Sequence, residues 1–206
     1  MAVPAKGVTN SRAEVIRKKN ELNLSPLFVI DNLYRGVKNL RFVIKFQNCF
    51  YLRKLHTKDL MKITLKPLGD IAEEIMNELR DRVNGIFNCP VEIRGGFNDL
   101  AHAYNSERKQ YLSSKFIALL KAVERESDER VVGVADVDFY APRLNFVFGE
   151  ADIISRTAIV SLCRLRQEYY GLAPDKNLFL ERATKEIAHE LGHTFGLGHC
   201  SNAKCV

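Results

Sequence analysis

The 206-residue sequence lacks features that define several classes of protein. It has no run of about 18 uncharged apolar residues, which argues against a transmembrane helix. Its first 20 residues contain no apolar segment of the kind found in a secretory signal peptide. It also has no internal repeat and no low-complexity run. We therefore expect a cytoplasmic protein that neither crosses nor binds a membrane.

A disulfide framework is also not expected. The five cysteines are an odd number, and no secretion signal accompanies them. Cysteines in such a chain are more often reduced thiols or metal ligands. The apolar fraction of 46% and the charged fraction of 27% are typical of a globular protein. The length fits one domain of ordinary size with an appendage.

The positive charge is confined to the first part of the chain. Residues 1–60 hold 12 Lys and Arg against 4 Asp and Glu, a net charge of +8. Because the whole chain carries +6, residues 61–206 carry a net charge of −2. Nucleic acid is therefore not an expected partner of the main domain. Met61 stands where an initiator would stand. We hypothesise that residues 61–206 form the domain, and that the basic extension 1–60 is an artefact or a separate appendage.

The remaining sequence alternates between strand-like and helix-like segments. Strands are predicted where β-branched and aromatic residues alternate or cluster, and helices where apolar residues recur three to four positions apart. Asp70 is expected to cap the first helix, and Pro174 with Asp175 to open the last one. The predicted strands are 62–68, 91–94, 131–140, 145–148 and 153–162, and the predicted helices are 70–83, 106–124 and 174–194. This order predicts an α/β sandwich of mixed strand directions around one core.

The segment from Glu186 to Cys205, EIAHELGHTFGLGHCSNAKC, carries the strongest chemical signal. His189 and His193 are four residues apart on a predicted helix, so both imidazoles can reach one ion from the same face. Neutral imidazole nitrogens are good ligands for Zn²⁺. Glu190 is placed to contact a water molecule beside the metal, as a general base must.

His199 is the natural third ligand. On a continuous helix it would lie about 9 Å beyond His193 and face away from it, so the helix must break, and Gly196 and Gly198 allow the break. No Asp or Glu follows Glu190 that could serve instead. Three of the five histidines fall within eleven residues, with glycines at the required break, which argues against ordinary helix histidines. Three histidines with an adjacent Glu leave a fourth coordination position open, which favours a catalytic zinc over a structural one.

At this point the chain resembles a known family. H-E-x-x-H-x-x-G-x-x-H is the metzincin signature. The cysteines that follow it, Cys200 and Cys205, resemble those of the archaemetzincins. Further stretches that resemble this family are KPLGDI (66–71), AYNSERKQYLSS (103–114), GVADVDFY (133–140) and NFVFGEA (145–151). The resemblance covers residues 61–206.

The resemblance implies a zincin-like α/β (α+β) fold, in which a mixed sheet packs against an active-site helix. It implies a catalytic zinc on the three histidines, with Glu190 as the base, and a structural zinc held by four cysteines, of which Cys200 and Cys205 are two. In the family, a Met follows the second of these cysteines by two residues, and a C-x-x-C pair comes later. The sequence ends at Val206, so we expect a domain without its C-terminal subdomain and with only half of the cysteine site.

The predicted function is a zinc metallopeptidase that hydrolyses peptide bonds. The alternative is a non-catalytic zinc-binding or peptide-binding protein, or an inactive fragment. Asn145, Phe146 and Val147 are candidates for substrate binding on an edge strand above the cleft, although a core strand fits them equally well.

Several other side chains have less specific interpretations. Tyr104, Asn105, Arg108 and Tyr111 could line the cleft, but we favour Asn105 as a helix cap and Tyr111 as a core residue. Asp136 and Asp138 are expected to face solvent without binding calcium. Cys49, Cys89 and Cys163 are interpreted as small buried residues.

Overall fold

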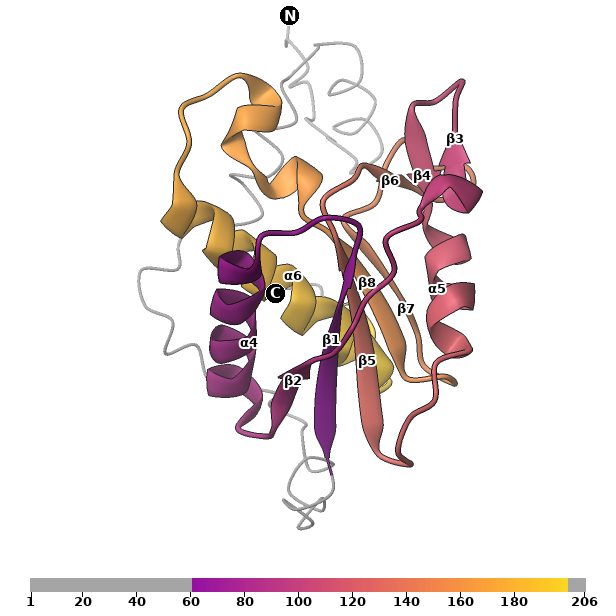
Figure 1. Ribbon diagram of the computed structural model, residues 1–206, viewed down its shortest axis with the longest axis vertical. Coiled ribbons are helices and arrows are strands. Elements are labelled where there is room, and N and C mark those ends of the chain that lie inside the picture. Colours follow the sequence, from indigo (N-terminus) through magenta and orange to yellow (C-terminus); the bar gives the residue numbers. More distant parts are fainter. Residues whose placement is uncertain (1–60, 200–206) are drawn as a thin grey trace, which may run out of the picture. The chain divides into compact units, whose positions relative to one another are not determined.

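The computed structural model describes residues 61–199 of the chain, and the proposed extension, Cys49, Cys200 and Cys205 lie outside them. Its centre is a five-stranded sheet in the order β2-β1-β5-β8-β7 (Figure 1). Four of these strands are parallel, and β7 is antiparallel to β8 and forms one edge. The strands are β1 (Lys62–Leu68), β2 (Val91–Ile93), β5 (Glu129–Ala135), β7 (Gly149–Asp152) and β8 (Thr157–Ser161).

Helices cover both faces of the sheet. The helices α4 (Glu73–Phe87) and α6 (Lys176–Thr194) lie on one face, and α5 (Ser113–Lys121) lies on the other (Figure 1). Successive strand residues point to opposite faces, so Val132 and Val134 of β5 join the core under α4 and α6, while Val131 and Ala135 join the core under α5. The predicted α/β class with a mixed sheet and a long C-terminal helix is confirmed.

A second, smaller sheet lies beside the main one. It has the order β3-β4-β6, with β3 at Tyr104–Asn105, β4 at Gln110–Leu112 and β6 at Phe139–Tyr140. Three short 3₁₀ helices, η1 (Ala101–Ala103), η2 (Cys163–Leu165) and η3 (Gln167–Tyr170), complete the connections. Within residues 61–199, no helix is long and apolar enough to cross a membrane.

The predicted helix 106–124 is wrong in its first half. Residues 104–112 form the β3–β4 hairpin instead, and the helix begins only at Ser113. The Oδ1 atom of Asn105 accepts a hydrogen bond from the Arg108 backbone N–H, and Lys109 has a φ of 54°. A side chain that bonds to the backbone three residues later stabilises a turn as readily as a helix start, so this pattern was ambiguous.

Other boundaries also differ. The predicted strand 131–140 is interrupted after Ala135, and residues 145–148 form no strand; the edge strand β7 follows them instead. The predicted cap Asp70 is wrong as well, because α4 begins at Glu73 and its N-cap residue, Ala72, makes no side-chain hydrogen bond. By contrast, the Asp175 carboxylate caps α6 by accepting from the Leu178 N–H at 3.0 Å, as predicted.

Candidate metal centre

The last turns of α6 bring two histidines together. His189 and His193 are one helical turn apart, and their Nε2 atoms are 3.0 Å from each other. The helix core beneath them is apolar, with Ile187 and Leu191 fully buried against the sheet. The apolar face therefore fixes the rotation of α6 about its axis, and this rotation presents both imidazoles on the same side.

The chain turns sharply after these histidines. The α6 helix ends at Thr194, and Gly196 adopts a φ of 85°, in the left-handed region that favours glycine. The Gly196 N–H donates to the His193 carbonyl and the Leu197 N–H donates to the Gly192 carbonyl, which is the hydrogen-bond pattern of a Schellman helix end. This turn returns His199 to the other two histidines, with its Nε2 atom 3.1 Å from that of His193.

The three nitrogens have the separation that a zinc ion requires. Two ligands with Zn–N bonds of about 2.0–2.1 Å at a tetrahedral angle lie about 3.3 Å apart, close to the two distances above. The Nδ1 atom of His193 is 2.7 Å from the Leu197 carbonyl oxygen, which only accepts hydrogen bonds. Nδ1 of His193 must therefore carry the proton, so its Nε2 atom presents a lone pair to the metal position.

No other cluster of this kind occurs among residues 61–199. His189, His193 and His199 are the group of His, Cys, Asp or Glu side chains in this range whose donor atoms converge on one point. Cys89 is buried, and burial raises the pKa of its thiol to about 11, as it does for Cys163. Both thiols therefore stay protonated at neutral pH. Cys89 is a small buried residue, as predicted, whereas Cys163 is only half-buried.

Glu190 directly follows His189 on α6, and its side chain is buried. It is 4% exposed, and its Oε2 atom has no hydrogen-bond partner among the described residues. Burial, followed by the neighbouring carboxyls of Glu186 and Glu150, raises the pKa of Glu190 well above its usual range. A buried carboxyl with an unsatisfied oxygen is expensive to keep unless it serves a reaction or a ligand.

Gly149, at the start of the edge strand β7, makes room for this carboxyl. A Cβ atom added at Gly149 would lie 2.6 Å from Cγ and 2.7 Å from Oε1 of Glu190, and 2.7 Å from the Ile159 carbonyl oxygen. Such distances are far inside van der Waals contact. A side chain at position 149 and the observed Glu190 position therefore exclude each other. The sequence alone did not single out Gly149, although it stands in the NFVFGEA stretch.

For the peptidase activity predicted from the sequence, with Glu190 as its base, we expect Gly149→Ala to lower kcat by about 10²-fold, because displacing a reacting group by about 1 Å has an effect of that size. Zinc content should stay the same, because the substitution faces Glu190 rather than the histidines. Steady-state kinetics and metal analysis of the purified variant measure both quantities. Gly85→Ala is the control, because a Cβ there meets nothing within 4 Å. A Gly149→Ala enzyme with unchanged kcat would contradict this role.

The predicted substrate residues 145–147 lead into β7. The Val147 N–H donates to the Phe139 carbonyl, the Asn145 carbonyl accepts from Arg108 and Gln110, and Phe146 stacks under the Arg164 guanidinium. These contacts hold the segment to the smaller sheet. The edge-strand position belongs to β7, and the idea that residues 145–147 touch substrate stays a prediction.

Asp136 and Asp138 have a different role from the one expected. Asp138 binds Arg164 through two hydrogen bonds of 2.6 and 2.7 Å, and Asp136 forms an ion pair with Arg166. The prediction that they face solvent is wrong for Asp138, whose side chain is 14% exposed, whereas Asp136 is 30% exposed. Alternation along the chain cannot reveal that each pairs with an arginine 26 to 30 residues later. Neither belongs to a convergent metal-ligating group in the described part of the chain.

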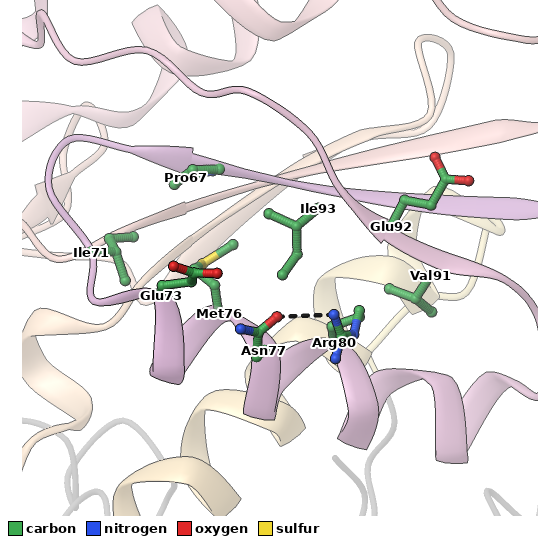
Figure 2. A pocket seen from close by; sticks show the side chains of 9 residues that line it. All are labelled: Pro67, Ile71, Glu73, Met76, Asn77, Arg80, Val91, Glu92 and Ile93. Carbon is green, nitrogen blue, oxygen red and sulfur yellow. Dashed lines mark hydrogen bonds between the residues drawn. The ribbon is translucent and has the colours of Figure 1, made fainter.

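A separate hollow lies near the edge strand β2, at the other end of the sheet from β7. It has a volume of about 620 Å³ and lies between α4 and the strands β1 and β2 (Figure 2). Its lining mixes apolar side chains with a few polar ones: Pro67, Ile71, Glu73, Met76, Asn77, Arg80, Val91, Glu92 and Ile93. It contains no histidine or cysteine, so it is not part of the candidate metal centre.

Comparison with known families matches residues 55–206 to Peptidase family M54. An archaemetzincin of Methanocaldococcus jannaschii is 42% identical over 147 residues, which cover 71% of this chain and 79% of that protein. An archaemetzincin of Pyrococcus abyssi is 40% identical over 150 residues, which cover 70% of this chain and 80% of that protein.

Solved structures give the same result. The crystal structure of the archaemetzincin of Methanopyrus kandleri is 39% identical, with a TM-score of 0.58 over 71% of this chain and 79% of that chain. The structure of a zinc-dependent peptidase from Methanocorpusculum labreanum is 29% identical, with a TM-score of 0.62 over 68% of this chain and 84% of that chain.

Proposed function

The chain belongs to peptidase family M54 and is a zinc metallopeptidase, and we propose that His189, His193 and His199 hold its catalytic zinc. The observation that carries this proposal is the convergence of the three imidazoles, with Nε2 separations of 3.0 and 3.1 Å. The substrate is a peptide or protein. Glu190 is then the general base.

The open fourth position separates a catalytic zinc from a closed structural one. When bound, the zinc ion supplies a Lewis acid that activates water, polarises the scissile carbonyl and favours the ionised form of Glu190. Glu190 accepts the proton of the attacking water and donates it to the leaving amine. The Glu190 side chain is buried, and the lack of a side chain at Gly149 leaves the space that its carboxyl occupies.

We propose that an extended peptide substrate aligns along the edge strand β7. Within residues 61–199 this strand pairs with β8 on one side only, and its first residue, Gly149, is in close contact with Glu190. Addition of a strand to an exposed edge is a common way to bind an extended chain through backbone hydrogen bonds. The catalytic carboxyl would then lie beside the scissile bond.

Two further assignments belong to this proposal. We place the peptidase domain at residues 61–206, which agrees with the family match over 55–206. We also propose that Cys200 and Cys205 contribute to a second, structural zinc site when further cysteines are available, because two thiolates alone cannot close a tetrahedral site. The cytoplasmic location stays a prediction.

Metal analysis of His193→Ala tests the zinc site. The variant is expected to hold one zinc ion fewer than the parent chain and to lose peptidase activity, because two histidines cannot retain the metal. Counting the difference makes the result independent of any zinc on the cysteines. His102→Ala is the matched control, since His102 is an exposed histidine on η1 outside the cluster. Equal zinc contents in parent and His193→Ala would refute the assignment.

A cleavage assay on the parent chain, run beside the metal analysis, distinguishes the rival function. A zinc-binding protein without catalysis would bind zinc through the three histidines and cleave no member of a library of fluorescence-quenched peptides. A site of three protein ligands, which would leave a fourth position for water, and the buried Glu190 carboxyl on the same helix favour turnover.

A further inference from the structure

The third zinc ligand has few contacts that hold it in place. His199 is exposed, and its described contacts are with the rings of His189 and His193. His199 directly follows the turn of residues 195–198, so the geometry of this turn sets where His199 lies relative to the other two histidines. The anchor of this turn therefore determines how well the zinc site is preformed.

Phe195, the C-cap residue of α6, is that anchor. Its ring is stacked with Phe87, at the end of α4, with centroids 6.2 Å apart and an interplanar angle of 17°. The guanidinium carbon of Arg130 lies 3.6 Å from the centroid of the same ring. Phe195 thus joins the ligand-bearing turn to both α4 and β5. The α4 helix covers the face of the sheet to which Val132 and Val134 of β5 point (Figure 1).

Arg130 has an unusual environment for a cation. It lies on β5 two residues before Val132, so its side chain points to the same face as Val132 and Val134, toward the core under α4 and α6. Its Nε atom is buried without a hydrogen-bond partner among the described residues. Burial lowers the pKa of Arg130 to about 10, so the group is still charged at neutral pH. The charge of the Asp128 carboxylate and the contact with the face of the Phe195 ring both favour the charged guanidinium.

We propose that Arg130 is a positioning residue for zinc binding, which acts by stacking on Phe195 and so fixing the turn that presents His199. The inference rests on the proposed histidine site. The contact between a guanidinium and a ring face is directional, because the flat, charged group must lie over the ring. The contact therefore restricts the orientation of Phe195 more than an aliphatic neighbour of equal size does.

The test compares zinc affinity in the full chain before and after Arg130→Met, which keeps the volume and removes the charge. Competition with a chromophoric chelator should give a zinc dissociation constant about 10-fold higher in the variant, in line with the 10- to 100-fold effects of residues that orient metal ligands. The histidine site is isolated by subtracting the titration of His189→Ala. Circular dichroism at the same temperature shows that each variant is folded.

Two further variants separate positioning from general stability. In a Phe195→Leu background, Arg130→Met should change zinc affinity by less than about 2-fold, because the two residues act through one contact. Arg80→Met, an arginine on α4 that pairs with Asp81 outside the turn, should have no effect on zinc affinity. If Arg130→Met does not fold, Arg130→Lys replaces it, since lysine keeps the charge but lacks the planar face and should also weaken zinc binding.

The possible results have distinct meanings. If the parent chain binds no zinc at the histidines, the proposed function fails and the role of Arg130 fails with it. If the parent binds zinc and Arg130→Met, or its lysine substitute, binds equally well, only the role of Arg130 is overturned. The role is also overturned if Arg130→Met weakens zinc binding as much in the Phe195→Leu background as in the parent chain, because the arginine would then act without the ring.

Discussion

Glu190→Gln should lower kcat for peptide hydrolysis by about 10²–10⁴-fold while zinc content stays at the parent level, because the removal of a general base has an effect of that size. The amide has the same shape as the carboxyl but cannot accept and pass on a proton. Glu190 is 4% exposed, with an unsatisfied Oε2 atom, so a neutral side chain of equal volume should not disturb folding. A fluorescence-quenched peptide library and metal analysis measure activity and zinc.

The control for this variant is Glu181→Gln, the same chemical change more than two turns earlier on α6. It should leave kcat and zinc content unchanged, because Glu181 lies outside the metal centre. A Glu190→Gln enzyme that keeps parental kcat would rule out Glu190 as the base, even if the histidines bind zinc. A variant that loses both activity and zinc would instead show that Glu190 supports the metal site structurally.

The local parts of the candidate site could be predicted from the sequence. His189 and His193 lie on one face because helical periodicity is a property of neighbouring residues, and Gly196 marks the turn because only a glycine adopts its φ of 85° without strain. The Asp175 cap follows from the same kind of short-range rule. These features depend on residues at most six positions apart.

The parts that the sequence did not reveal depend on distant residues. Gly149 and Glu190 are 41 positions apart in the chain, and only the packing of α6 against β7 brings them into contact. Arg130 and Phe195 meet in the same way. A glycine or an arginine in a strand has many explanations in a sequence, and only the tertiary partner selects one of them.

The incorrect helix 106–124 has a related cause. Residues 104–112 form strands because β4 pairs with both β3 and β6, and β6 lies about 30 residues later. Local propensity was compatible with helix, and tertiary pairing overrode it. The residue that connects these elements is Asp138, which directly precedes β6.

Asp138 forms the densest polar network among the described residues of this region. Its carboxylate accepts from Arg164 at 2.6 and 2.7 Å and from Gln110 at 2.9 Å, and its carbonyl accepts from the Tyr111 N–H. Arg164 in turn stacks on Phe146 and Tyr169. Asp138 therefore links β4, η2 and the segment that leads into β7 and Gly149.

Asp138→Ala is expected to lower the free energy of unfolding by about 3 kcal/mol, since it leaves Arg164 largely buried without its carboxylate. For a domain of this size, thermal unfolding should shift by about 6–12 °C, which calorimetry measures. Asp136→Ala is the matched control: its pair with Arg166 is about twice as exposed, so the expected loss is about 1 kcal/mol or less. Equal shifts for the two variants would mean that the network around Asp138 contributes no more stability than a single exposed ion pair. A larger shift for Asp138→Ala, accompanied by lower kcat, would show that the segment before β7 transmits this stability to the position of Glu190.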